Sequence, residues 1–337
     1  MNKSRQHGGN IYKMAEELLC QPEEIIDFSS NINPTVPTIE LHIEAKSLQV
    51  YADPTYYELK KSIALKYNIV PSEMKLFNGA SSAIFALFAQ LDFSHVALYA
   101  PLYGEYKEAA LAHGKKVQLI NRLDDTWDKP HEGSLVVFVN PSTPDGRLYD
   151  FKALLDEWQA LNCQVIMDES FLEFSEAKSL RTEIKSYKNL HIIQSFTKFY
   201  ACAGLRIGAV FSHRDNINNL FTPMWPISSL DTTLLLRLLG DKDHQTKSRE
   251  NFSKLSQRLR SILCYALCFD EVYQSHANYI LTKSSRAKEI EERLLEHKII
   301  VRNCESFDFL DESYLRFAVK DNKALDALEE ALKGINE

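Results

Sequence analysis

The chain has 337 residues, which is enough for about two domains and a large buried core. Its 39 Lys and Arg residues against 46 Asp and Glu residues give a formal net charge of −7, and 45% of its residues are hydrophobic. An acidic chain is poorly suited to nucleic acid or an anionic membrane, so the composition predicts a soluble globular enzyme or binding protein with neither as a partner.

The six cysteines are scattered along the chain, and no two of them have the C-x-x-C spacing. We therefore expect reduced thiols, no zinc or other metal site, and a cytoplasmic location. The polar N-terminus, Met1 to Asn10, has no apolar stretch typical of a signal peptide. The longest apolar-rich segment, Ala80 to Leu91, is too short to cross a bilayer.

Residues 1–40 are predicted to form an N-terminal arm with a short helix, and residues 41–240 a large domain. In the large domain, apolar β-rich runs alternate with helical patterns. The predicted strands are His95–Ala100, Lys115–Ile120, Ser134–Asn140, Cys163–Ser170, Leu190–Thr197 and Ile207–Ser212, with helices around Tyr103–Ala112 and Asp150–Leu161.

Several of these runs are apolar throughout and do not alternate with polar residues, as in the segment Leu135–Val139. This pattern is typical of strands that are covered on both faces. Together with the alternation of strands and helices, it predicts an α/β protein with a mostly parallel central sheet flanked by helices.

The pattern changes near residue 240, and we predict a smaller C-terminal α/β domain at residues 241–337. Its predicted elements are a helix at Gln245–Leu267, a strand at Glu271–Thr282, a helix at Arg286–His297, a strand at Tyr314–Val319 and a last helix with Leu325, Leu328 and Leu332. Gly334 is expected just past the end of that last helix.

Two features of the large domain are suited to face a ligand. Asn78-Gly79-Ala80-Ser81-Ser82 opens a predicted helix, and a turn of small residues at a helix N-terminus presents free N–H groups to an anion. Asp168 ends an apolar run, which places its carboxylate at the carboxyl edge of a parallel sheet, where ligands bind. Each feature also has a purely structural interpretation as a helix or turn cap.

Two cationic residues, Lys198 and Arg206, come later in the sequence and are eight residues apart. Lys198 comes after another apolar run, in Gln194-Ser195-Phe196-Thr197-Lys198, where partial burial lowers the pKa of an amine and makes it nucleophilic. Eight residues later, Arg206 offers a guanidinium suited to bidentate phosphate binding. Taken alone, each side chain is better explained structurally, Lys198 as a lysine whose stem packs on the protein while its ammonium reaches water, and Arg206 as an ordinary surface arginine.

The order and spacing of these four features resemble those of fold-type I enzymes that use pyridoxal 5′-phosphate (PLP), the superfamily of the class I and II aminotransferases. The small-residue turn, the strand-ending acid, and the S-x-T-K segment with an arginine eight residues later occur in the same order, and the resemblance covers nearly the whole chain. It implies the PLP-dependent transferase fold, with a smaller C-terminal domain and PLP as the cofactor.

By this resemblance, Lys198 would attach to PLP through its amine, and Asp168 would pair with the pyridine nitrogen. Tyr103 matches the aromatic residue that stacks on the ring. Tyr51 matches a tyrosine that reaches the cofactor phosphate of the neighbouring subunit, which implies a homodimer with shared active sites. The groups expected to hold the phosphate within one subunit are Ala80, Ser81, Ser195, Thr197 and Arg206.

The N-terminal segment narrows the resemblance to one branch of the superfamily. His7-Gly8-Gly9-Asn10 and the segment from Asp27 to Pro34 are similar to the threonine-phosphate decarboxylases, close relatives of the histidinol-phosphate aminotransferases. The resemblance implies decarboxylation of L-threonine O-3-phosphate to 1-aminopropan-2-ol O-2-phosphate, in cobalamin biosynthesis. The substrate, a phosphorylated small amino acid, would be contacted by His7, Asn31, Arg302 and the carboxylate-binding Arg316.

Two positions depart from the pattern of the superfamily. Relatives usually read N-P-N-N-P-T-G at Asn140–Gly146, so Thr143 stands in place of the asparagine that bonds the cofactor's O3′. Phe171 stands where aminotransferases usually have tyrosine. Both changes weaken hydrogen bonding to O3′, and the resemblance then implies a raised pKa for the imine.

Two alternatives stay open from the residues alone. An aminotransferase acting on histidinol phosphate would use the same side chains. A PLP-fold protein that has lost catalysis would act as a binding or regulatory protein, although the intact Lys198, Asp168 and Arg206 argue against this second alternative.

Overall fold

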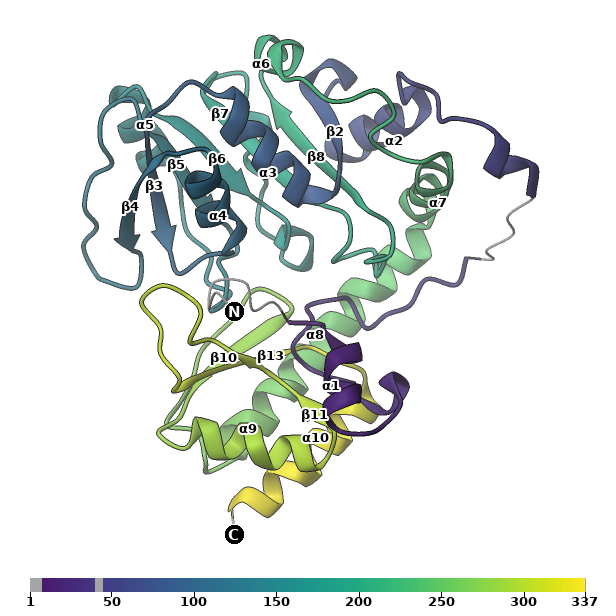
Figure 1. Ribbon diagram of the computed structural model, residues 1–337, viewed down its shortest axis with the longest axis vertical. Helices are drawn as coiled ribbons and strands as arrows, with labels where there is room; N and C mark the ends of the chain where they lie inside the picture. The colour runs from purple at the N-terminus through teal and green to yellow at the C-terminus, as the bar shows by residue number, and fades with distance from the viewer. Residues whose placement is uncertain (1–7, 40–44, 337) are drawn as a thin grey trace.

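The structure, a computed structural model, describes residues 8–39 and 45–336. A seven-stranded sheet with the order β2-β8-β7-β6-β5-β3-β4 forms the centre of its larger part (Figure 1). The strands are β2 (Met74–Asn78), β3 (His95–Ala100), β4 (Lys116–Asn121), β5 (Leu135–Val139), β6 (Gln164–Asp168), β7 (Leu190–Ser195) and β8 (Ile207–Ser212).

The pairs β3–β4, β3–β5, β5–β6 and β6–β7 are parallel, whereas β8 runs antiparallel to both of its neighbours, β7 and β2. The predicted mostly parallel α/β sheet is therefore confirmed. The sequence analysis missed β2, in which Lys75 interrupts the apolar run.

Helices cover both faces of this sheet. Those of the larger part are α2 (Tyr57–Tyr67), α3 (Gly79–Gln90), α4 (Glu105–Ala112), α5 (Lys152–Ala160), α6 (Arg214–Asn219) and α7 (Ser229–Gly240). Short 3₁₀ turns lie at Pro22–Glu24, Ala45–Gln49, Pro71–Glu73, Leu172–Phe174 and Leu180–Glu183.

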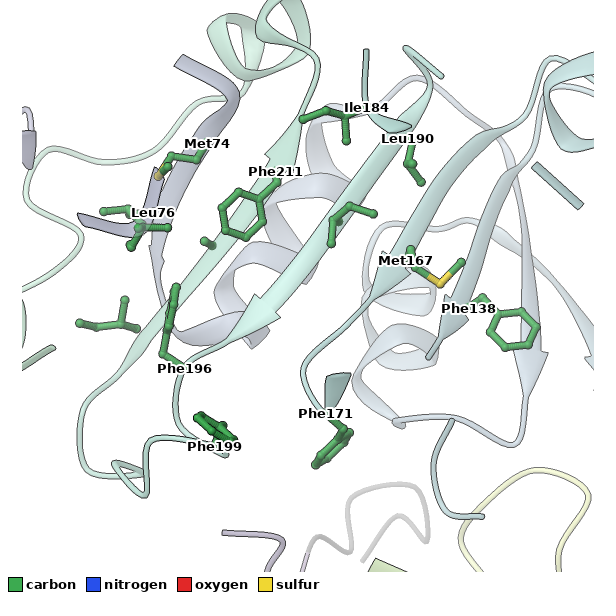
Figure 2. Packing of buried hydrophobic residues seen from close by; sticks show 14 of the residues in the cluster. Met74, Leu76, Phe138, Met167, Phe171, Ile184, Leu190, Phe196, Phe199 and Phe211 are labelled. Atoms are coloured by element: carbon green, nitrogen blue, oxygen red, sulfur yellow. The ribbon is translucent and has the colours of Figure 1, made fainter. Parts of the chain in front are cut away.

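The apolar strands are buried on both sides, as their sequence predicts. Along β5, Val136 and Phe138 pack in one core with α2, α5 and α7, while Val137 and Val139 pack in the other with α3 and α4. Figure 2 shows part of the first core, in which Phe171 lies at the rim of the sheet. Burial of each such side chain contributes about 1.5–3 kcal/mol, so the central strands anchor the loops that follow them.

A second, smaller sheet has the order β12-β13-β10-β9 and lies below the first in Figure 1. The long helix α8 (Lys242–Tyr265) runs from one part of the molecule to the other. The remaining elements are β9 (Glu271–Val272), β10 (Tyr279–Lys283), α9 (Ala287–Glu296), β11 (Ile299–Ile300), β12 (Arg302–Asn303), β13 (Tyr314–Ala318) and α10 (Asn322–Asn336).

Two details of the C-terminal prediction are wrong. The predicted strand Glu271–Thr282 is two strands, β9 and β10, which pair antiparallel because the chain reverses direction in the segment around Ser275. Gly334 does not lie past the last helix but within α10. The helix continues because Ile335 is buried in the small core, and its burial outweighs the cost of roughly 1 kcal/mol for an exposed helical glycine.

The N-terminal segment is fixed between the two sheets. After α1 (Ile11–Glu17), the short strand β1 (Ile26–Asp27) pairs in parallel with β11, and Phe28 enters the core of the smaller sheet. Asn33 then contacts the loop after β7.

The division of the chain into an arm, a large domain and a small domain, with bounds at residues 40 and 240, stays a proposal. No helix among the described residues combines the length and the apolar composition needed to cross a membrane.

Candidate active site

A cavity of about 260 Å³ lies between the two sheets, at the carboxyl ends of β5 and β6 and beside the loop after β7. Segments from the whole chain form its wall, from Gly8 to Arg316. It is lined by these residues that the sequence singled out: Asn31, Ala80, Ser81, Tyr103, Thr143, Asp168, Ser195, Thr197, Lys198, Arg206, Arg302 and Arg316.

Asp168 ends β6 with its carboxylate inside the cavity. The Tyr106 hydroxyl donates to its Oδ2 at 2.7 Å, and the Ser170 backbone N–H donates to its Oδ1 at 2.9 Å. Burial raises the pKa of Asp168, whereas the hydrogen bonds from Ser170 and Tyr106 and the nearby Lys198 act in the opposite direction. The carboxylate is thus held in one orientation, and it is suited to accept a hydrogen bond from an N–H group of a ligand ring.

Lys198 follows β7 in a tight turn, and its ammonium lies among other cations. Burial lowers the pKa of Lys198 to about 8, with smaller contributions of the same sign from Arg316 and Arg206. A far larger fraction of this amine is neutral at physiological pH than for an exposed lysine, so it is a nucleophile. The turn is held from the N-terminal segment, because Asn33 donates from N to the Lys198 carbonyl (3.1 Å) and from Nδ2 to the Phe199 carbonyl (2.7 Å).

Glycines leave room for an anion at the start of α3. Gly79 has φ +77°, and a Cβ there would lie 2.8 Å from Nη2 of Arg206. A Cβ on Gly208 would lie 2.5 Å from the backbone N of Ala80. The Asn78 side chain does not cap this helix, so its first amides are suited to an anion beside the Arg206 guanidinium.

Hydroxyl groups and an aromatic ring complete this end of the cavity. The Ser195 and Thr197 hydroxyls lie 2.8 Å apart, and the Ser195 backbone N–H donates to the Ser170 hydroxyl at 3.1 Å. Tyr103 is half-buried in the wall, with its ring edge-to-face to Tyr106 at 6.4 Å between centroids. The arrangement offers a flat wall and several donors around one anionic group.

The smaller sheet contributes two further guanidinium groups, from the adjacent strands β12 and β13. Arg302 and Arg316 are paired directly across these strands. Nη2 of Arg302 donates to the Ser306 hydroxyl at 2.6 Å. Burial, and then the charge of Arg316, lower the pKa of Arg302 to about 10. Burial also lowers the pKa of Arg316.

Positively charged side chains outnumber negatively charged ones in the cavity wall. The wall carries Lys198, Arg206, Arg302 and Arg316 against the carboxylate of Asp168. Buried like charges repel one another, so the cavity is built for a ligand with several negative charges.

Several residues at the site were missed by sequence reasoning. Tyr106 lies three residues after Tyr103, at the spacing of one helix face, which was a usable signal. Arg122 and Asp145 form a buried bidentate ion pair at 2.9 and 2.7 Å under the loop that carries Thr143. Lys320 donates to the Ser30 carbonyl at 2.9 Å. No local pattern marked these last three residues, because their contacts join distant segments.

The wall of the cavity includes Asn31 but not Tyr51. The Asn31 side chain lines the cavity, and its buried Oδ1 has no hydrogen-bond partner among the described residues. Tyr51 lies outside the cavity, is 77% exposed and stacks on Trp225 at 4.3 Å between ring centroids. His7 lies outside the described residues.

A model of one family matches almost this whole chain. The match to "Aminotransferase class I and II" extends over residues 23–333. The chain belongs to this family, whose members use PLP.

Two curated relatives match over nearly the full chain. The adenosylcobalamin biosynthesis bifunctional protein CobDQ of Leptospira interrogans is 33% identical over 98% of the chain, which spans only 41% of that protein. The threonine-phosphate decarboxylase of Salmonella typhimurium is 26% identical over 98% of the chain and 97% of its own length.

Solved structures share the fold. The histidinol-phosphate aminotransferase of Clostridium acetobutylicum superposes with a TM-score of 0.81 at 29% identity, covering 92% of this chain and 98% of its own. That of Sinorhizobium meliloti, solved in complex with PLP, has a TM-score of 0.82 at 18% identity over 98% of this chain and 96% of its own.

The cofactor of the chain is PLP, and the cavity fits it. The space left by Gly79 and Gly208 beside Arg206 suits the phosphate, Lys198 suits the aldehyde, and Asp168 suits the ring nitrogen. When bound, PLP draws electrons from a bond broken at the α-carbon of an amino-acid substrate. The individual contacts of these residues with the cofactor remain proposals.

Proposed function

We propose that this protein decarboxylates L-threonine O-3-phosphate to 1-aminopropan-2-ol O-2-phosphate, as a lyase of cobalamin biosynthesis in the cytoplasm. The observation that carries the proposal is the pair Arg302 and Arg316, adjacent guanidinium groups left over after the cofactor has been assigned Lys198, Asp168 and Arg206. A substrate with a phosphate and a carboxylate has an anion for each of these arginines.

The residues of the chain divide the work as follows. Arg316 holds the substrate carboxylate and fixes its angle to the plane of the cofactor ring, which decides the bond that breaks. Arg302 and Asn31, together with His7, bind the remaining polar groups. Lys198, with its lowered pKa, returns a proton to the α-carbon after CO2 has left.

We further propose a homodimer with shared active sites. The Tyr51 side chain lies outside the cavity of its own subunit and is exposed together with its stacking partner Trp225. In the dimer, the Tyr51 hydroxyl reaches the cofactor phosphate of the other subunit. The assignment of Tyr51 is supported by the resemblance of the segment Tyr51-Ala52-Asp53-Pro54 to the pattern of the family.

The test is incubation of the PLP-loaded protein with O-phospho-L-threonine, with and without 2-oxoglutarate. We expect CO2 and the amino-alcohol phosphate in both reactions, at equal rates, because decarboxylation needs no amino acceptor. O-phospho-L-serine, which lacks one methyl group, serves as the comparison substrate. Release of no CO2 from either compound would falsify the proposed reaction.

A second candidate is an aminotransferase acting on histidinol phosphate. It is favoured by the similarity to the histidinol-phosphate aminotransferase of C. acetobutylicum, which is 29% identical to this chain, against 19% for the L-threonine-O-3-phosphate decarboxylase of Porphyromonas gingivalis. The same cations would bind a single phosphate, and the reaction would require 2-oxoglutarate. Conversion of histidinol phosphate only in the presence of 2-oxoglutarate, without CO2 release from phosphothreonine, selects this candidate.

A further inference from the structure

Thr143 is held on both sides by arginines. Its backbone carbonyl accepts from Nη2 of Arg122 at 3.0 Å, and its side-chain hydroxyl accepts from Nη1 of Arg316 at 3.1 Å. Thr143 is itself 5% exposed. One buried residue therefore joins an arginine that directly follows β4 of the larger sheet to the substrate arginine of the smaller sheet.

The first arginine is a rigid anchor. Arg122 is 1% exposed and is bound bidentately by the Asp145 carboxylate. Its Nε also donates to the Pro101 carbonyl at 2.9 Å. A planar guanidinium fixed on three sides holds the Thr143 backbone in place, and with it the position of the hydroxyl.

The second arginine is left with free donors. Of the five N–H groups of a guanidinium, Arg316 uses one on Thr143 and one, from Nη2, on the Ser29 carbonyl at 3.1 Å. Its buried Nε has no partner among the described residues. The Tyr279 ring lies 5.0 Å from the Arg316 Cζ, and its hydroxyl donates to the Ser142 carbonyl at 2.9 Å, next to Thr143. The guanidinium plane is thus set by its surroundings, and donors remain for an anion.

We infer that Thr143 is a positioning residue for Arg316: its hydroxyl, placed by the buried Arg122–Asp145 pair, orients the guanidinium toward the anionic group of the substrate. The hydroxyl serves the substrate arginine and not the cofactor ring. The inference rests on the proposed role of Arg316 in substrate binding, but it is independent of which bond of the substrate breaks.

The test compares PLP-loaded wild type with Thr143→Val, which keeps the shape and removes the hydroxyl, and Thr143→Ser, which restores it. The probe is phosphoglycolate, which has a carboxylate and a phosphate but no amine, titrated calorimetrically. Because Arg316 is proposed to hold the carboxylate, we expect the dissociation constant to rise about fivefold to tenfold in Thr143→Val and to stay within about twofold in Thr143→Ser. Thr282→Val is the matched control, since that buried hydroxyl donates to the Leu315 carbonyl at 3.1 Å, beside Arg316 but outside the cavity.

A second measurement tests whether the Thr143 hydroxyl acts on Arg316 or on the cofactor ring. The midpoint of the pH titration of the visible cofactor absorbance should be the same in Thr143→Val and wild type, because the hydroxyl does not bond the ring. A displaced midpoint, unchanged phosphoglycolate affinity in Thr143→Val, or a wild type that binds no phosphoglycolate would each overturn the inference. Should Thr143→Val fail to fold, Thr143→Ala is titrated in its place.

The two proposals fail separately. If wild type releases no CO2 from phosphothreonine but Thr143→Val binds phosphoglycolate more weakly, the proposed reaction is wrong and the role of Thr143 stands. If wild type decarboxylates phosphothreonine and Thr143→Val binds phosphoglycolate as wild type does, the role of Thr143 is wrong and the reaction stands.

Discussion

Burial shifts the pKa values of Lys198 and Asp168 in opposite directions. Burial disfavours the charged form of each group, so it lowers the pKa of the amine and raises that of the carboxyl group. The free amine suits attachment to PLP, and the carboxylate keeps hydrogen bonds from Tyr106 and Ser170 that hold it in place. Without the cofactor, these charges are a cost to the fold.

Replacement of Lys198 by Met should therefore stabilise the cofactor-free protein. The folded-state pKa of about 8 is below the unfolded value, so the ammonium destabilises the fold fully below pH 8. This cost disappears as the pH rises toward about 10.5, where the unfolded lysine also loses its proton. We expect a gain of up to about 3 kcal/mol in unfolding free energy at pH 7, measured by urea denaturation.

The pH series supplies the control for this prediction. The advantage of Lys198→Met over wild type should shrink between pH 8 and pH 10.5. The exposed Lys288, replaced by Met in the same way, should give no pH-dependent difference of this size. Equal stabilities of Lys198→Met and wild type at pH 7 would show that the amine is not buried at a cost.

Replacement of Arg316 by Lys tests the substrate side of the cavity. Lysine keeps the charge but loses the planar guanidinium that contacts Thr143 and the Ser29 carbonyl. Loss of a charge-assisted bidentate contact costs about 1.5–3 kcal/mol, or about 10- to 150-fold in kcat/KM. We expect kcat to fall as well as KM to rise, since orientation of the carboxylate belongs to the transition state.

The contrary result for Arg316→Lys is a raised KM with an unchanged kcat. That result would mean that the guanidinium binds substrate and transition state equally and does not fix the carboxylate angle. A partial switch of the products toward transamination, measured with 2-oxoglutarate present, would add support to the orienting role.

At the scale of elements, the start of α3 depends on β8 coming very close to it. Gly208 of β8 faces the backbone of Gly79 and Ala80, with a Cβ position 2.5 Å from the Ala80 nitrogen. Backbone atoms cannot move aside as a flexible side chain can. The first turn of α3 and the space beside Arg206 are thus determined by two neighbouring elements together.

Gly208→Ala should disturb both the fold and the cofactor site. We expect a loss of about 1–3 kcal/mol in unfolding free energy, as for other overpacked positions, and about tenfold weaker PLP binding. Gly204→Ala is the matched control, because a Cβ there meets no atom within 4 Å. Equal PLP affinities of Gly208→Ala and Gly204→Ala, measured by fluorescence titration, would contradict the proposed phosphate site.

At the scale of the whole molecule, the cavity exists only because two sheets and the N-terminal segment meet. Residues Ser29 to Asn31 lie in its wall, and Asn33 holds the loop that carries Lys198. The long helix α8 connects the two parts (Figure 1). All described residues that we assign to one active site come from the same subunit, with the exception of Tyr51. In the proposed dimer, the Tyr51 of each subunit serves the active site of the other subunit.

Mixed dimers test the shared sites. A dimer of one Tyr51→Phe subunit and one Lys198→Ala subunit keeps one site with both native residues if Tyr51 acts across the interface. That site should bind PLP with wild-type affinity, whereas the Tyr51→Phe homodimer should bind about fivefold more weakly, the scale of one hydrogen bond of about 1 kcal/mol. The two kinds of subunit carry different affinity tags, so that the mixed dimer is purified away from both homodimers. Its PLP affinity is then measured.

An active site contained within one subunit gives the opposite result. The mixed dimer would then bind PLP with the weaker affinity of Tyr51→Phe. A monomeric wild type in light scattering would equally exclude sharing.

The six predicted strands of the larger sheet all exist, because an unbroken apolar run such as Leu135–Val139 is stable only when it is covered on both faces. Short-range chemistry also indicated the site. Asp168 ends one such strand and Lys198 follows another, so each was a candidate to face a ligand. The family resemblance implied that both bind one cofactor, and the structure places both in the wall of one cavity.

Only the tertiary structure decided the partners of these side chains. Arg316 meets Thr143 across 173 residues of sequence, Arg122 meets Asp145 beneath it, and Tyr106 reaches Asp168 from α4. Local periodicity reports which face of an element is buried, but it carries no information on which distant segment covers that face. The sequence by itself thus determined the fold class and marked the candidate site residues, whereas the packing of the two sheets determined what each of those residues touches, because such contacts depend on the positions of whole elements.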